Sequence, residues 1–122
     1  MYKGIDHTAI ASPDPEGLAD WYYRTFGFPI SHRIEANIFL QASDETKLEI
    51  IPSDGKSVST EFKTPGIRHI AIRVLDFNVA INDLAHKGIE IDQVLNIQGN
   101  LLAFFTDPEG NILHLVQWKK DT

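Results

Sequence analysis

The chain has 122 residues, of which 43% are hydrophobic and 23% are charged, a composition typical of one compact folded domain and not of a disordered chain. It contains no cysteine, which excludes disulfide bonds and cysteine ligands to a metal. The net charge of −6 argues against nucleic acid as the main partner. No apolar run has the length needed to cross a membrane, and the first residues lack a secretory signal. We therefore expect a cytoplasmic protein that acts on a small molecule.

The first half of the chain predicts a strand, a helix and three further strands. Residues 4–11 read as a strand, and residues 15–26 carry apolar side chains at helical spacing. A proline at the start of this segment and Gly27 at its end are typical of helix termini. Three short strand-like segments follow, at residues 28–34, 36–42 and 46–52.

The same order of elements returns in the second half. Residues 66–74 read as a strand, and residues 76–87 predict an amphipathic helix that Gly88 ends. Three more strands are predicted at residues 89–95, 100–106 and 111–118. Between the halves, residues 53–66 are polar and without periodicity, as expected of a linker.

Two stretches of sequence recur in the same order in both halves. The segment around His7 aligns with the segment around His69, 62 positions later, and the segment around Glu49 aligns with the segment around His114, 65 positions later. These matches predict an α+β fold of two tandem βαβββ modules related by a pseudo-twofold axis. We expect one domain over residues 1–122, divided into module 1 (1–52), a linker (53–66) and module 2 (67–118).

Four metal-competent residues occupy equivalent positions in these repeats. Successive side chains of a strand point to opposite faces, so the apolar neighbours of each of the four face the helix layer and the four themselves face the other side. A single histidine in a strand is more often structural than a ligand, but the repetition favours a site. Three imidazoles and one carboxylate suit a divalent Zn, Ni, Fe, Co or Mn ion. The four are His7, Glu49, His69 and His114.

Two other residues are weaker candidates for substrate binding. Arg73 shares the strand face of His69 and can meet a carboxylate or phosphate group of a substrate, although an ion pair with a surface aspartate explains it equally well. Trp118 shares the face of His114, where an aromatic residue is more often part of the core. We set His32 aside as a site residue.

The layout resembles the vicinal oxygen chelate superfamily, which includes glyoxalase I, fosfomycin-resistance proteins, methylmalonyl-CoA epimerase, extradiol dioxygenases and bleomycin-resistance proteins. The matching segments cover nearly the whole chain, and the most specific is the DPEGN run at residues 107–111. They are residues 5–28, 48–51, 67–76 and 104–117. The resemblance implies that the two modules form an open, curved, mixed sheet around a metal cavity. It also implies a homodimer.

The resemblance places the metal ligands on the first and last strand of each module, at the same four residues. It implies a glyoxalase I-like lyase or isomerase that uses a divalent metal ion and acts on a small α-oxygenated substrate, with glutathione or another thiol as a candidate co-substrate. Glu49 is then the best general base. One departure matters, because members of the family usually carry glutamate where this chain has His114.

Two alternatives stay open. A metal-free protein of the bleomycin-resistance type would bind a small molecule such as an antibiotic, and the four metal-competent residues argue against it. A non-haem iron dioxygenase would use the same cavity, and the histidine at position 114 counts against it. Metal analysis separates the first alternative from a metal-dependent enzyme, and oxygen consumption with a catechol tests the second.

Overall fold

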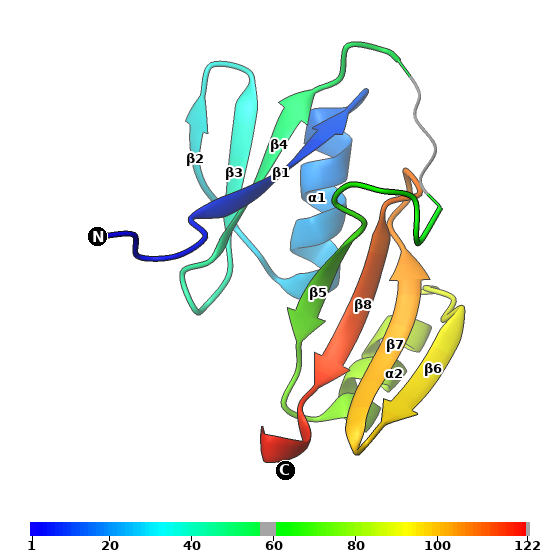
Figure 1. Cartoon of the computed structure of the whole chain (residues 1–122). Coiled ribbons are helices and arrows are strands. Elements are labelled where there is room, and N and C mark those ends of the chain that lie inside the picture. The colour runs from blue at the N-terminus through cyan, green and yellow to red at the C-terminus, as the bar shows by residue number, and fades with distance from the viewer. Residues whose placement is uncertain (57–60, 122) are drawn as a thin grey trace. The chain divides into compact units, whose positions relative to one another are not determined.

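The computed structural model describes residues 1–56 and 61–121. The chain divides into two compact units, Met1–Ser57 and Val58–Thr122, and each is described by itself. The first unit contains β1 (His7–Ser12), α1 (Pro15–Phe26), β2 (Ile30–Ile34), β3 (Asn37–Gln41) and β4 (Lys47–Pro52) (Figure 1). The second contains β5 (His69–Arg73), α2 (Phe77–His86), β6 (Gln93–Ile97), β7 (Asn100–Thr106), β8 (Ile112–Gln117) and a 3-10 turn, Lys119–Asp121. From here on, module 1 and module 2 denote these two units, which divide the predicted linker between them.

Both modules have the same sheet topology. The strand order is β1-β4-β3-β2 in module 1 and β5-β8-β7-β6 in module 2. In each sheet the first and last strands of the module lie side by side and run parallel, whereas the other neighbours are antiparallel. The predicted α+β class and the tandem βαβββ order are therefore confirmed, with two open, mixed, four-stranded sheets in the described part of the chain.

The register of the parallel strands confirms the internal alignment made from the sequence. Ala9 of β1 lies opposite Glu49 of β4, and Ala71 of β5 lies opposite His114 of β8. Ala71 lies 62 positions after Ala9, and His114 lies 65 positions after Glu49. These are the offsets that align the two halves of the sequence. The repeat is thus a repeat of strand pairing as well as of element order.

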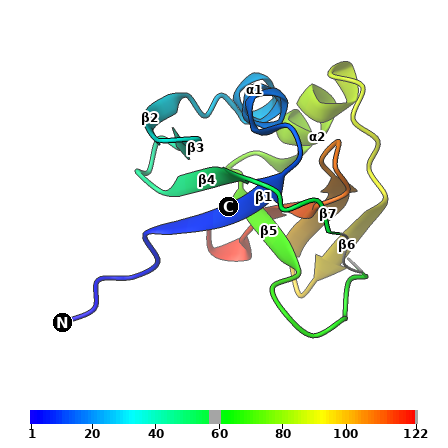
Figure 2. The ribbon, with the colours of Figure 1, turned by 90° about the horizontal axis from the view of Figure 1, so that it is seen from above.

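In module 1 the core lies between α1 and one face of the sheet (Figures 1 and 2). The helix begins where the Asp14 side chain accepts a hydrogen bond of 3.1 Å from the Gly17 N–H, and it ends at Gly27, whose φ of 76° favours glycine. Apolar side chains at every second strand position meet the helix, because strand side chains alternate. The most deeply buried apolar side chains are Leu18, Ala19 and Tyr22 on the helix and Ile38, Leu40 and Ile50 on the strands.

Module 2 builds its core in the same way and adds a buried polar contact. The Asp76 side chain accepts a hydrogen bond from the Val79 N–H at the start of α2. The buried side chain of Gln117, at the end of β8, accepts a second one from the Phe77 N–H at 2.6 Å and so ties the helix to the sheet. The buried apolar residues include Phe77, Leu84, Ala103, Phe105, Leu113 and Leu115.

Several strand boundaries differ from the sequence prediction, and β5, for example, begins at His69 and not at residue 66. Two of the differences have a clear structural reason. The first strand begins at His7 and not at residue 4, because its parallel partner β4 begins at Lys47, and Ile5 is 86% exposed. The strand predicted at residues 89–95 runs instead over β6, which continues to Ile97. There a two-residue turn with positive φ at Gln98 (56°) and Gly99 (90°) leads directly into β7, a geometry typical of tight hairpins.

The predicted linker, residues 53–66, includes residues 57–60, which lie outside the described residues. At its start the Ser53 N–H donates a hydrogen bond of 2.8 Å to the Ser12 carbonyl, which extends the pairing of β1 with β4. Neither α1 nor α2, nor any other helix in the described part of the chain, has the length and apolarity to cross a membrane.

Candidate functional site

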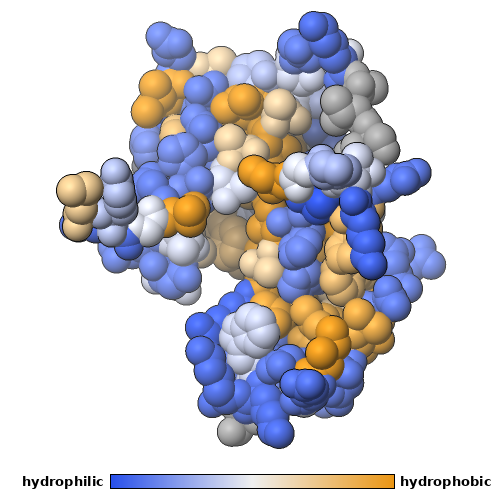
Figure 3. Space-filling model, viewed as in Figure 1, coloured by the Kyte–Doolittle hydropathy of each residue, from blue (hydrophilic) through white to orange (hydrophobic). Residues whose placement is uncertain are grey.

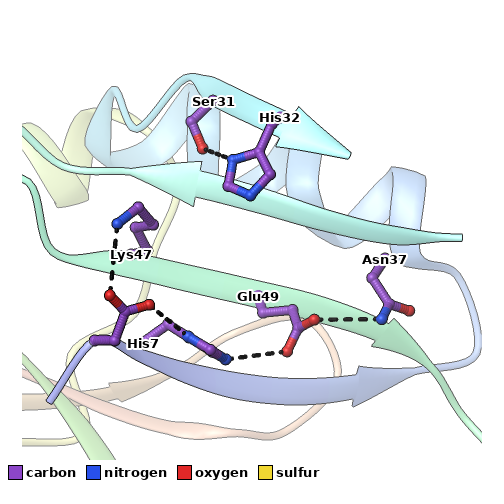
Figure 4. A network of polar contacts seen from close by, with 7 residues as sticks. His7, Ser31, His32, Asn37, Lys47 and Glu49 are labelled. Atoms are coloured by element: carbon purple, nitrogen blue, oxygen red, sulfur yellow. Dashed lines mark hydrogen bonds and ion pairs between the residues drawn. The ribbon is translucent and has the colours of Figure 1, made fainter. Parts of the chain in front are cut away.

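His7 and Glu49 lie side by side on the face of the module 1 sheet opposite α1. We call this the helix-free face. The two residues come from neighbouring strands, and His7 Nε2 is 3.5 Å from Glu49 Oε1 (Figure 4). Leu48 and Ile50, on either side of the glutamate, are buried toward the helix, as the alternation predicted. The Glu49 side chain is only 13% exposed, so its carboxylate depends on nearby polar partners.

Polar neighbours orient both members of this pair. His7 Nδ1 is 2.9 Å from a carboxylate oxygen of Asp6, and Asn37 Nδ2 donates to the second Glu49 oxygen at 3.3 Å. Lys47 Nζ lies 3.9 Å from Asp6. The hydrogen bond from His7, followed by the Lys47 charge, lowers the pKa of Asp6. An imidazole whose Nδ1–H donates to a carboxylate keeps Nε2 for a metal ion, the usual arrangement of metal-binding histidines.

An aromatic stack continues this face of module 1 beyond Glu49. Phe39 of β3 lies directly opposite Glu49 in the sheet, and His32 of β2 lies opposite Phe39. The His32 and Phe39 rings stack with centroids 4.4 Å apart, while the His7 ring meets Phe39 edge-on at 5.3 Å. The structure therefore brings His32, which sequence reasoning set aside, onto the face of the predicted ligands.

His69 and His114 form the corresponding pair on the helix-free face of module 2. Their ring centroids are 4.7 Å apart. His114 is only 6% exposed, and its Nδ1 lies 3.1 Å from the Leu115 carbonyl oxygen. Burial lowers the pKa of His114, the Leu115 carbonyl opposes this effect, and a charge on His69 adds to it. The His114 imidazole is therefore held neutral, with Nδ1–H on the carbonyl and Nε2 as a lone-pair donor.

Phenylalanine rings surround the two histidines of module 2. Phe104 lies opposite His114 in the sheet, with ring centroids 4.8 Å apart. Phe62 stacks beside His69 at 5.9 Å and meets Phe104 edge-on at 5.3 Å. The space-filling view shows hydrophobic and hydrophilic patches mixed over these strands (Figure 3). The histidine pair of module 2 thus sits among aromatic rings, where module 1 has charged and amide groups.

The two weaker candidates, Arg73 and Trp118, lie at the carboxyl ends of β5 and β8 in module 2. The Arg73 guanidinium forms an ion pair with Asp121, with its terminal nitrogen 2.8 and 2.6 Å from the two carboxylate oxygens. Trp118 follows the last residue of β8 and is 40% exposed. Their roles in substrate binding stay predictions. Within residues 1–56 and 61–121, no three His, Asp or Glu side chains are grouped as a metal site, so the four-ligand set also stays a prediction.

Sequence reasoning missed several polar and aromatic neighbours of the predicted ligands. Asn37 and Phe39 lie on β3, which pairs antiparallel with β4. Alternation, followed from Glu49 across this pairing, could have placed both side chains on the face of Glu49. Asp6 is adjacent to His7 in sequence, but nothing in the sequence shows that its carboxylate bends back to the ring. Phe62 lay in the predicted linker and carried no periodic signal.

The fold consists of two βαβββ modules, and each module carries a pair of metal-competent residues on its first and last strands. This combination points to one class of protein. The sequence matches the model of the Glyoxalase/Bleomycin resistance protein/Dioxygenase superfamily over residues 4–115. The chain belongs to this superfamily, and the resemblance drawn from the sequence is confirmed.

Individual relatives support the same assignment. The chain is 28% identical over 127 aligned positions to the uncharacterized protein YwkD of Bacillus subtilis (strain 168), covering 96% of this chain and 98% of the relative. A solved glyoxalase family protein from Enterococcus faecalis is 28% identical, with a TM-score of 0.78 over 94% of this chain and 98% of that one. The lactoylglutathione lyase of Agrobacterium tumefaciens is 16% identical, with a TM-score of 0.76 over 98% and 96% of the two chains, and shares the fold.

Proposed function

We propose that this protein is a divalent-metal-dependent lyase or isomerase of the glyoxalase kind that acts on a small α-oxygenated substrate. One observation carries the proposal. Each module places two metal-competent side chains next to each other at equivalent positions of its sheet, His7 with Glu49 and His69 with His114. In the proposed site one ion is held by one pair of each kind, either from the two modules of one chain or from one module of each of two chains.

The donor atoms of these residues fit such an ion. Nδ1 of His7 faces a carboxylate and Nδ1 of His114 faces a backbone carbonyl, so both rings keep Nε2 as a lone-pair donor. With His69 and the Glu49 carboxylate, the set comprises three nitrogen ligands and one anionic oxygen ligand, which suit Zn, Ni, Co, Fe or Mn. The bound ion would act as a Lewis acid toward adjacent oxygen atoms of the substrate.

The residues of module 1 supply the proton chemistry in this proposal. Glu49 is the single carboxylate of the proposed ligand set, and we assign it the role of general base. The amide of Asn37, 3.3 Å from one of its oxygens, holds the carboxylate in position. The resemblance to glyoxalase I makes glutathione, or another thiol, the co-substrate to test first. Arg73 and Trp118 are proposed to contact the substrate.

Elemental analysis of the purified protein tests the metal site. We expect about one divalent ion per chain in the native protein, or after reconstitution with each of the five metals. Because one ion is shared, substitution in either module should remove it, so His7→Ala, Glu49→Ala and His69→Ala should each lose metal. His86→Ala is the matched control, since His86 lies on α2 and bonds the Asn82 carbonyl. A native protein that binds no ion would favour the metal-free binding alternative.

Turnover of the methylglyoxal–glutathione hemithioacetal tests the reaction. The metal-loaded protein should convert it, and Glu49→Gln should reduce kcat by about 10²-fold or more, because general-base catalysis contributes on this order. Full turnover by a metal-loaded Glu49→Gln protein would exclude Glu49 as the base. Oxygen consumption with a catechol, in place of hemithioacetal turnover, would favour the dioxygenase alternative.

We further propose that the two modules make one domain and that the chain acts as a homodimer in the cytoplasm. Homodimers are the commonest form of symmetric assembly in soluble proteins. Light scattering coupled to size-exclusion chromatography tests this part, with twice the 13.7 kDa chain mass as the expected result.

A further inference from the structure

His32 lies at the centre of a strand that no predicted ligand occupies. It is solvent-exposed on β2, and its ring lies flat against Phe39, with an angle of 10° between the ring planes. Phe39 is itself buried and also touches the ring of His7. Both imidazoles therefore contact one phenyl ring, and Figure 4 shows His32 on the same sheet as His7 and Glu49.

Ser31 engages one of the two ring nitrogens of His32 and leaves the other open. Ser31 Oγ donates to the Phe39 carbonyl oxygen at 3.3 Å, and it lies 2.9 Å from His32 Nδ1. A hydroxyl can both donate and accept, so the serine oxygen engages Nδ1 of His32 in either tautomer of the ring. Nε2 of His32 is therefore the ring nitrogen that Ser31 leaves open.

The other polar groups of this face are already engaged with one another. One Glu49 oxygen faces His7 and the second accepts from Asn37, while Asp6 faces His7 and Lys47. A charge on His32 also contributes to the lowered pKa of Asp6. Within the described residues, no hydrogen bond engages Nε2 of His32, so this ring nitrogen is open to a substrate.

We propose that His32 is a catalytic residue that exchanges a proton with the substrate through Nε2, alongside Glu49. The proposal rests on the proposed function. In an isomerisation of an α-hydroxy carbonyl, Glu49 takes the proton of the C–H bond that breaks, the electron pair stays on the substrate, and the proton returns to the neighbouring carbon. The substrate hydroxyl also loses its proton as its carbon becomes a carbonyl, and Nε2 of His32 passes that proton to the oxygen of the former carbonyl, so no net proton or electron is gained. Such transfers are most often carried out by histidine.

Steady-state kinetics of His32→Gln with the methylglyoxal–glutathione hemithioacetal tests the role. Because the change removes a proton carrier and no ligand, kcat should fall by about 10²- to 10⁴-fold while KM and metal content stay close to native values. The pH–rate profile should also lose the limb that reports the His32 base. His86→Gln, a histidine on α2 bonded to a backbone carbonyl, is the matched control and should keep native kinetics.

Nitrogen NMR of the metal-free protein tests the contact of Ser31 with His32 Nδ1 independently of activity. Ser31→Ala removes this contact and should shift the Nδ1 resonance of His32 and lower kcat, whereas Ser31→Thr keeps the hydroxyl and should leave both close to native values. An Nδ1 resonance that Ser31→Ala leaves unchanged would overturn the orientation of His32 on which the proposal rests.

The results separate this proposal from the proposed function. A native protein that binds metal and turns over the hemithioacetal, with His32→Gln equally active, overturns the role of His32 alone. A native protein with no metal or no turnover overturns both. Loss of metal from His32→Gln would show a ligand or a structural residue and would also overturn the proton-transfer role.

Discussion

The two modules share a backbone plan and differ in what they carry on it. In both, the first strand pairs with the last in the same register, and the helix covers one face. On the other face, module 1 carries a carboxylate, hydrogen-bonding groups and two exposed imidazoles around Glu49, whereas module 2 carries the exposed His69 and the buried His114 beside Phe62 and Phe104. The two modules therefore place their site residues at equivalent strand positions, but the chemical character of these residues differs. Only module 1 supplies a negative charge and proton carriers to the proposed site.

The largest expected effect tests whether the two cores are equivalent. Ile50 and Leu115 occupy matching positions, opposite Ile10 and Ile72, and are 0% and 2% exposed. Replacing either by alanine leaves a cavity and should lower the free energy of unfolding by about 2–5 kcal/mol. Chemical denaturation measures this loss. Leu75→Ala, at a side chain 77% exposed, is the control and should change stability by less than about 0.5 kcal/mol. Unequal costs at the two buried positions would break the equivalence.

A smaller effect distinguishes how the two helices are anchored. Gln117→Leu in module 2 leaves the buried Phe77 N–H without its acceptor and should cost about 1–3 kcal/mol. Asp14→Ala in module 1 removes an exposed cap from the Gly17 N–H and should cost about 1 kcal/mol. Denaturation midpoints of the two variants, measured together, give the comparison. Equal losses would mean that the glutamine contributes no more than an ordinary helix cap.

The smallest expected effect is the pH dependence that His114 of module 2 adds to the stability of the protein. In the folded, metal-free protein, burial holds the pKa of His114 below its ordinary value of 6.5. The unfolded chain therefore takes up a proton first as the pH falls through 6.5, so the stabilisation by neutral His114 is present above that pH and is lost below it. Denaturation in the presence of a chelator at about pH 7.5 and pH 5 measures this loss. His114→Gln should show a smaller loss, and an unchanged pH dependence would contradict the assignment.

Most of the fold could be predicted from the sequence because its signals are local or repeated. Proline at the start of α1 and Gly27 at its end fix the helix termini. Alternation in β1 and β4 predicted which side chains of the two strands face the helix, and the burial of Ile10, Leu48 and Ile50 agrees. The start of β1 could not be predicted, because it depends on where the partner strand β4 begins.

The candidate site was only partly predictable, because side-chain partners depend on register across strands. Repetition identified His7, Glu49, His69 and His114 as equivalent, and the pairing of β1 with β4 and of β5 with β8 places them in neighbouring pairs. The position of His32 depends on a register shift in β2, between Ile30 and His32, that strand alternation alone does not reveal.

The parallel pairing of β1 with β4 has a consequence for how the protein folds during synthesis. β1 finds its hydrogen-bonding neighbour β4 only after about forty further residues have emerged from the ribosome, and β5 must likewise precede β8. Pairings between such distant segments form slowly, because a long loop must close before any contact compensates for its lost entropy. Each module is therefore expected to fold as a unit once its final strand has been made, with the hairpins β2–β3 and β6–β7 forming ahead of it.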